Sequence, residues 1–260
     1  MTRLTHVGGP TVLVELGGWR VLTDPTFDPA GRRYGFGWGT SSRKLVGPAL
    51  HPDQLGPVDL VLLSHDHHPD NLDSRGRALL PAAGTVLTTR AGARRIAAPH
   101  VRGLAAGETT VLEATGKAPL SVRATPCRHG PRLSRPVAGP VIGFALSLGA
   151  DPATAIWMTG DTVLHGPVRR LAGELTVDVM LMHLGAVRFP VTGRLRYSMN
   201  GADASRLLDL FRPRVAVPVH YEGWSHFSEP VEQLRRSLDA VGSSARDSIM
   251  WLTPGRATEV

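Results

Sequence analysis

The sequence predicts an α/β fold in which mixed β-sheets are covered by helices. Short, branched apolar segments typical of buried strands recur along the chain, for example residues 58–63 and 177–184. Segments with the apolar spacing of an amphipathic helix alternate with them, most clearly residues 201–211. No internal repeat, low-complexity segment or long linker divides the 260 residues, so we expect one domain over residues 1–260.

The first half of the chain is expected to contain more strands than helices. The predicted strands are residues 11–16, 20–23, 58–63, 85–89, 110–113 and 120–125, and the predicted helices are residues 72–80 and 91–98. Gly17-Gly18 is a hairpin turn between the first two strands. Residues 26–57 are rich in Gly, Pro and aromatic side chains and have no periodicity, so they form either one wall of a pocket or a mobile surface insertion.

The second half alternates strands with longer helices. The predicted strands are residues 141–148, 154–159, 177–184, 214–219 and 248–253, and the predicted helices are residues 168–175, 201–211 and 229–241. A short polar side chain before a helix can accept a hydrogen bond from its first turn. We therefore expect Asn200 to cap the helix at 201–211 and Ser228 to cap the helix at 229–241.

Composition indicates a cytoplasmic globular protein. Apolar residues make up 42% of the chain and charged residues 20%, and no apolar run approaches the roughly 20 residues that span a bilayer. The first residues contain no apolar signal segment. The single cysteine, Cys127, cannot form an internal disulfide, which agrees with a reducing compartment, and we expect a buried, inert thiol.

The positive charge favours a small anionic substrate over nucleic acid. The formal net charge is +7, and because only Lys44 and Lys117 are lysines, 27 of the 29 basic residues are arginines. These arginines occur in scattered pairs and not in one stripe, so we expect no nucleic-acid partner and no membrane partner. A small-molecule substrate is expected, and a homo-oligomer remains open.

One segment, Ser64-His65-Asp66-His67-His68-Pro69-Asp70-Asn71-Leu72-Asp73, is unusually rich in metal-binding residue types. It places three histidines and three aspartates within nine residues, directly after the buried strand at 58–63. Imidazole nitrogens and carboxylate oxygens bind zinc and also harder ions such as manganese or iron. The segment is therefore a candidate metal site, and the alternative is a solvated polar loop.

Four further residues stand in the same kind of position, each just after an apolar strand: Asp24, His129, Asp161 and His220. Buried imidazoles and carboxylates are costly unless they are paired or coordinated, so their repeated occurrence at strand ends points to one shared site. His183 also ends a strand, and it is either part of the same site or a packed core histidine.

The order of these motifs resembles the metallo-β-lactamase superfamily. The chain reads His65-x-His67, then Asp70, a lone His129, Thr159-Gly160-Asp161-Thr162, and a late His220. The branch of ascorbate-6-phosphate lactonase and N-acyl-phosphatidylethanolamine phospholipase D is most similar. Three segments carry that likeness: Gly8-Gly9-Pro10-Thr11-Val12-Leu13-Val14-Glu15, Leu22-Thr23-Asp24-Pro25, and Ser64-His65-x-His67 followed by Leu72-Asp73. The resemblance implies a four-layer αββα sandwich with metals at the edge where two sheets meet.

The resemblance also implies a set of ligands for one or two ions, with zinc expected and manganese or iron as alternatives. The implied ligands are His65, His67 and His129 for the first ion, Asp161 as a bridge, and Asp70 and His220 for the second ion. Asp24 would not bind an ion itself but would orient the ligands by hydrogen bonding. The family usually reads His-x-His-x-Asp-His, whereas here Asn71 stands where the last histidine is expected. We therefore expect a weaker second site, with His68 either supporting the ligands or replacing the missing one.

The implied activity is metal-dependent hydrolysis by a metal-bound hydroxide that Asp70 or Asp161 orients. The expected substrates are small, anionic lactones, esters, amides or phosphoesters. Arg188 and Tyr197 are candidates for binding an anionic or carbonyl group, unless they are solvated loop residues. The alternatives are a phosphodiesterase or nuclease on the same fold, and a non-catalytic metal-binding regulatory protein.

Overall fold

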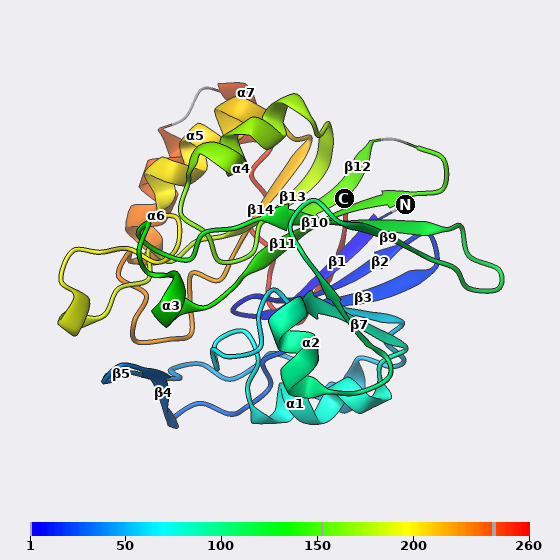
Figure 1. Ribbon diagram of the computed structural model, residues 1–260. Coiled ribbons are helices and arrows are strands. Elements are labelled where there is room, and N and C mark those ends of the chain that lie inside the picture. Colours follow the sequence, from blue (N-terminus) through cyan, green and yellow to red (C-terminus); the bar gives the residue numbers. More distant parts are fainter. Residues whose placement is uncertain (1, 152, 241–242) are drawn as a thin grey trace.

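The chain forms a four-layer αββα sandwich, in which two β-sheets pack face to face and helices cover both outer faces (Figure 1). The computed structural model describes residues 2–151, 153–240 and 243–260. Within these residues, no helix is long and apolar enough to cross a bilayer. The α/β fold class and the four layers expected from the sequence are confirmed.

The first sheet contains seven strands among the described residues, in the order β15-β1-β2-β3-β6-β7-β8. Their bounds are β15 (Ala257–Glu259), β1 (Thr2–Gly8), β2 (Thr11–Leu16), β3 (Trp19–Thr23), β6 (Leu60–Leu62), β7 (Thr85–Thr89) and β8 (Val101–Leu104). The predicted hairpin is confirmed, because β2 and β3 are antiparallel and Leu16 pairs with Trp19 across Gly17-Gly18. Both glycines have positive φ, 54° and 84°, which the turn requires.

The second sheet has six strands in the described part of the chain, in the order β14-β13-β12-β11-β10-β9. Their bounds are β14 (Val215–Val219), β13 (Val177–His183), β12 (Thr154–Met158), β11 (Ile142–Leu148), β10 (Leu120–Pro126) and β9 (Thr109–Leu112). A separate antiparallel pair, β4 (Arg33–Gly37) and β5 (Thr40–Arg43), lies in the long loop after β3.

Helices cover the outer faces of both sheets (Figure 1). The first sheet is covered by α1 (Ser74–Leu79) and α2 (Arg90–Ile96), and the second by α4 (Gly166–Arg170), α5 (Gly201–Phe211), α6 (Val231–Asp239) and α7 (Ser243–Asp247). The short α3 (Arg135–Ala138) lies in the loop between β10 and β11, and 3-10 turns span Pro52–Gln54, Leu80–Ala82, Leu171–Gly173 and Pro190–Thr192.

Helix α5 shows how local sequence sets one of these layers. The Asn200 side chain accepts a hydrogen bond from the Asp203 backbone N–H, as predicted, and so caps the first turn. Ala204, Leu207, Leu208 and Phe211 are buried, and this i, i+3, i+4, i+7 spacing places them on one face of the helix. That face belongs to the apolar cluster between the helices and the second sheet.

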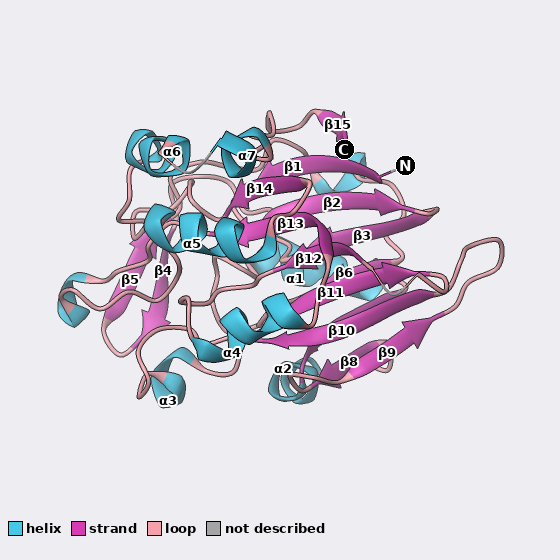
Figure 2. Cartoon of the chain, turned by 90° about the horizontal axis from the view of Figure 1, so that it is seen from above, coloured by secondary structure: helices cyan, strands magenta, loops and turns pink. Residues whose placement is uncertain are grey.

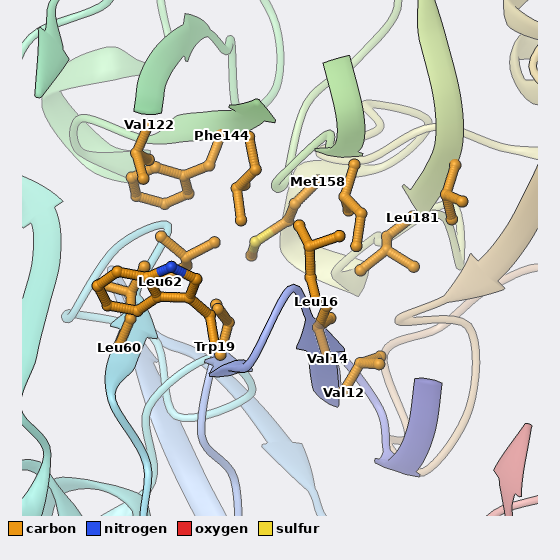
Figure 3. Packing of buried hydrophobic residues seen from close by; sticks show 14 of the residues in the cluster. Val12, Val14, Leu16, Trp19, Leu60, Leu62, Val122, Phe144, Met158 and Leu181 are labelled. Carbon is orange, nitrogen blue, oxygen red and sulfur yellow. The ribbon is translucent and has the colours of Figure 1, made fainter. Parts of the chain in front are cut away.

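The main core fills the space between the two sheets (Figure 3). Val12, Val14 and Leu62 of the first sheet meet Phe144 and Met158 of the second. Strands with one face on this core and the other under helices are buried on both sides, which explains their nearly continuous apolar sequence.

The strands that carry the candidate ligands all end at one edge of the sandwich. Strands β3, β6 and β7 are mutually parallel, and so are β12, β13 and β14. Strand β10 runs in the same direction as β12, because both are antiparallel to β11. Figure 2 shows the β4–β5 hairpin beyond this end of the sheets. Polar loops from both sheets therefore meet under that hairpin.

Two expectations about the C-terminal region are wrong. Residues 248–253 form no strand, since only Ile249 makes a single bridge, to Ala216, before the chain leaves to pair as β15 with β1. Ser228 does not cap α6, because its hydroxyl donates to the Ala186 carbonyl and the helix begins after Pro230. Val241, the predicted end of that helix, lies outside the described residues.

Candidate metal centre

The candidate ligands converge from both sheets, as the positions of their strands dictate. Each lies at or just beyond the C-terminal end of a strand: Asp24 after β3, His65, His67, His68 and Asp70 after β6, His129 after β10, Asp161 after β12, and His220 after β14. Within the described residues, three groups have ligand atoms all within 4.8 Å of one another: His65/His67/His68, His65/His129/Asp161, and Asp70/Asp161/His220.

Three histidines of the cluster, His65, His67 and His129, are oriented by hydrogen bonds on their outer ring nitrogens. His129 Nδ1 donates to the Tyr197 carbonyl at 2.6 Å, and His67 Nε2 donates to the Ala138 carbonyl at 2.7 Å. His65 Nδ1 lies 2.9 Å from the Ser64 hydroxyl. The other nitrogen of each ring therefore directs a lone pair into the cluster, which is how a metal-binding histidine is normally held.

His68 lies inside this cluster. Its Nδ1 is 2.9 Å from Nε2 of His65 and 3.1 Å from Nε2 of His129. Burial first, and neighbouring imidazoles second, hold the pKa of His65 and of His68 well below the usual histidine value. Burial also lowers the pKa of His129. The rings are consequently neutral at physiological pH, which is the form that binds metal.

The sequence reasoning missed His226, a histidine that lies beside the Asp70/Asp161/His220 group. Asp70 Oδ2 lies 3.2 Å from His220 Nε2 and 3.0 Å from His226 Nε2, and all three side chains are buried. His220 Nδ1 is 3.5 Å from Asp161 Oδ1. Although burial opposes its protonation, the Asp161 and Asp70 carboxylates raise the pKa of His220 to about 9. The two histidines outweigh burial at Asp70 and hold the pKa of its carboxyl well below its usual value.

Asp24 and Asn71 form a hydrogen-bonded layer behind the ligands. Asp24 accepts hydrogen bonds from the Ser64 backbone at 2.7 Å and from the Ser64 hydroxyl at 2.9 Å. The Asn71 amide donates to Asp24 at 3.1 Å, and His183 Nε2 lies 3.4 Å from the same carboxylate. His183 therefore belongs to this polar layer and not to the apolar core.

Many buried polar atoms at this edge have no partner among the described residues. They include both carboxylate oxygens of Asp161, Oδ1 of Asp70, and Nδ1 of His67, His220 and His226. A buried polar atom without a hydrogen bond costs about 1–3 kcal/mol, and a buried charge costs more. Their concentration at one place, with carboxylate and imidazole donors facing each other, fits one or two divalent cations.

An apolar pocket of about 230 Å³ opens onto the cluster. Its polar floor contains His68, Asp70 and His129, and its walls are Phe36, Trp38, Ala138, Val187, Phe189, Val191 and Tyr197. Phe36 and Trp38 come from the β4–β5 hairpin, so the expectation that residues 26–57 form a pocket wall is confirmed.

The two predicted substrate-binding residues are placed differently. The Tyr197 ring lines the pocket, whereas Arg188 is exposed and is not among the pocket-lining residues, although its neighbours Val187 and Phe189 are. Alternation explains the difference, because successive side chains of an extended segment point to opposite sides. His226 escaped detection because it lies in an irregular segment, two residues after Trp224, and follows no strand directly. The signal in the sequence is its place in the aromatic-rich segment after His220, which also holds Tyr221, Trp224 and Phe227.

An αββα sandwich with imidazoles and carboxylates gathered at the sheet edge is the arrangement expected of a metal-binding member of the metallo-β-lactamase superfamily. The family described as "Beta-lactamase superfamily domain" matches residues 19–221, and the chain belongs to this superfamily. It is similar to a metal-dependent hydrolase of Opitutus terrae, with 31% identity over 99% of this chain and 100% of the relative. That the chain belongs to the branch of ascorbate-6-phosphate lactonase and N-acyl-phosphatidylethanolamine phospholipase D stays a prediction.

Solved structures show the same fold. A protein described as a possible metal-dependent hydrolase, from Veillonella parvula, aligns with a TM-score of 0.84 and 21% identity, covering 100% of both chains. The isothiocyanate hydrolase from Delia radicum gut bacteria aligns with a TM-score of 0.80 and 20% identity, covering 99% of both chains.

Proposed function

We propose that this protein hydrolyses a small ester, lactone, amide or phosphoester with the help of one or two divalent ions held by the His/Asp cluster. The observation that carries the proposal is the convergence of buried, unpartnered ligand atoms in two groups that share Asp161. The relative from Opitutus terrae, named a metal-dependent hydrolase, supports the same reaction class.

The two groups differ in chemistry. His65, His67 and His129 offer three imidazoles with Asp161 beside them, which suits zinc. Asp70, Asp161 and His220 offer two carboxylates and one imidazole, which also suits manganese or iron. A bound ion of this kind polarises the scissile group and lowers the pKa of a coordinated water.

The protein's own groups would position the reactants. Oδ2 of Asp70 is held by His220 and His226, whereas Oδ1 has no hydrogen-bond partner among the described residues and is available to accept a proton from the attacking water. Phe36, Phe189 and Tyr197 line the pocket above the cluster, so they hold an apolar part of the substrate and exclude bulk water.

The pocket favours a small molecule over a polymer. Its volume of about 230 Å³ accommodates one compact group, and its walls are mainly apolar. Nucleic-acid binding needs several clustered phosphate contacts, which this pocket does not offer. We therefore propose a soluble cytoplasmic substrate with an apolar group next to the scissile bond, and neither nucleic acid nor membrane as partner.

The test combines metal analysis with an activity panel. The purified protein is analysed for bound metal by mass spectrometry and assayed on aryl esters, lactones, amides and phosphodiesters. His65→Ala should lose bound metal and hydrolysis together, while His51→Ala, which changes an exposed histidine, should keep both. Hydrolysis by a metal-free protein, or full activity in His65→Ala, would contradict the proposal.

A further inference from the structure

A second and larger cavity, of about 500 Å³, adjoins the candidate metal centre. It lies between the start of α2 and the β10–β11 loop, and four arginines line it: Arg90, Arg94, Arg128 and Arg135. His129 lines this cavity and the apolar pocket alike. The loop that contains α3 contributes to both, since Ala138 lines the apolar pocket and Gly139 lines the arginine cavity.

The neutral polar groups of the arginine cavity are already used within the protein. The Thr89 hydroxyl accepts a hydrogen bond from the Gly92 backbone N–H. The Ser134 hydroxyl donates to the His129 carbonyl at 2.7 Å, and the Cys127 thiol donates to the Thr159 carbonyl at 3.0 Å. The guanidiniums are therefore the charged side-chain groups left to meet a ligand, and they can only donate.

Three of these guanidiniums have no anionic partner in the described part of the chain. Arg90 contacts Glu108, but Arg94, Arg128 and Arg135 form no ion pair there. Nε of Arg128 is buried and makes no hydrogen bond to a described residue. A buried donor of this kind costs free energy until an acceptor reaches it, and planar guanidiniums match the oxygen pairs of carboxylates and phosphates.

We propose that the arginine cavity binds an oxyanion carried by the substrate, namely a carboxylate or a phosphate. The inference rests on the proposed hydrolase function, because it places the scissile bond beside His129, which lines both cavities. The substrate then has an apolar group in the aromatic pocket and an anionic group against Arg128 and Arg94. With the apolar group and the anionic group in separate cavities, the substrate can be anionic even though the pocket over the metal ligands is apolar.

Direct anion binding tests the cavity without any catalytic turnover. Inorganic phosphate and acetate are titrated by calorimetry into the metal-loaded protein, and the two ions distinguish phosphate from carboxylate recognition. Arg128→Gln and Arg94→Gln should each weaken binding of the preferred anion roughly tenfold, as expected for a lost charge-assisted contact. Arg94 is exposed on α2, so its variant leaves the core intact. Arg256→Gln removes the same charge from an exposed site outside the cavity and should not change binding.

The outcomes separate this inference from the proposed function. No binding of either anion at millimolar concentration, or equal weakening in Arg256→Gln, would overturn the proposal that the arginine cavity binds an oxyanion. Loss of anion binding in His65→Ala with no effect of the arginine variants would place the anion on the metal ligands and would also overturn it. Anion binding that depends on Arg128 and Arg94 in a protein without hydrolase activity would support the cavity and contradict the hydrolase proposal.

Kinetics provide a second measurement once a hydrolysed aryl ester is known. Two esters that differ only in a carboxylate distant from the scissile bond are compared. Arg94→Gln should raise KM for the carboxylate ester and leave KM for the neutral ester unchanged, because a remote contact contributes mainly to substrate binding. The same rise in KM for both esters would contradict the inference.

Discussion

Nε2 of His226 lies 3.0 Å from Oδ2 of Asp70, although the two residues are 156 positions apart in the chain. The His226 ring is buried and stacks on Phe189 at a centroid distance of 5.3 Å. Asn71, which stands where the family pattern has a histidine, instead bonds to Asp24. An imidazole is therefore present beside Asp70, but it comes from the segment after β14.

We expect His226→Ala to weaken the second of two metal-binding events and leave the first unchanged. Loss of a group that orients a metal ligand typically costs 10–100-fold in affinity. Calorimetric titration with manganese or zinc measures both events. His100→Ala, a partly buried histidine bonded to the Leu80 carbonyl away from the site, is the control. Unchanged affinity for both ions in His226→Ala would show that His220 alone is enough to orient Asp70.

Asp161→Asn should abolish tight metal binding and lower stability even without metal. Both Asp161 oxygens are buried and make no hydrogen bond to a described residue, but Oδ1 lies 3.5 Å from Nδ1 of His220, whose pKa the Asp161 and Asp70 carboxylates raise to about 9. In metal-free protein the carboxylate is therefore stabilised by a cationic neighbour, and the neutral amide loses that attraction. We expect the variant to bind no metal tightly and to be less stable than the wild type in chelator by about 1–3 kcal/mol. Thermal unfolding with and without chelator measures this. Asp53→Asn, at an exposed position, should change neither quantity.

Gly139→Ala should disturb the first metal group by direct contact. A Cβ atom at this position would lie 2.4 Å from Nε2 of His67, the nitrogen that donates to the Ala138 carbonyl. We expect tight metal binding to fall roughly tenfold or more. Gly149→Ala is a close control, since φ is +63° there and +65° at Gly139, but no atom of a described residue lies within 4 Å of the added carbon. Equal metal affinity in the two variants would show that His67 is not a ligand.

Asn71→His should not restore a stronger second site. From the sequence alone, this change is expected to tighten the second ion if position 71 faces the metals. In the structure the Asn71 side chain is fully buried and donates to Asp24 at 3.1 Å and to Ser64 at 3.4 Å. We expect a loss of about 1–3 kcal/mol in unfolding free energy, as in Asn71→Ala, because a buried hydrogen bond is lost. A tighter second ion in Asn71→His would contradict this expectation.

Much of the layer structure follows from local sequence. Helix α5 has the predicted bounds, and strand β13 was predicted to within one residue, because each has a continuous apolar pattern of one period. Strand β1 went unpredicted because Arg3, Thr5 and His6 interrupt its apolar pattern. Thr5 and His6 are nevertheless buried in the fold. Pairing with β2 on one side and β15 on the other makes this segment a strand.

The sequence by itself determined the fold class, the family and the residues that gather at the sheet edge, because a strand followed by His or Asp is a local pattern. Only the tertiary structure decided that His226 joins Asp70, that Asn71 turns toward Asp24, and that Arg188 remains outside the pocket. These outcomes depend on how loops from different strands close over the edge. Irregular loops have no periodicity from which side-chain direction can be inferred, so contacts between distant segments set their arrangement.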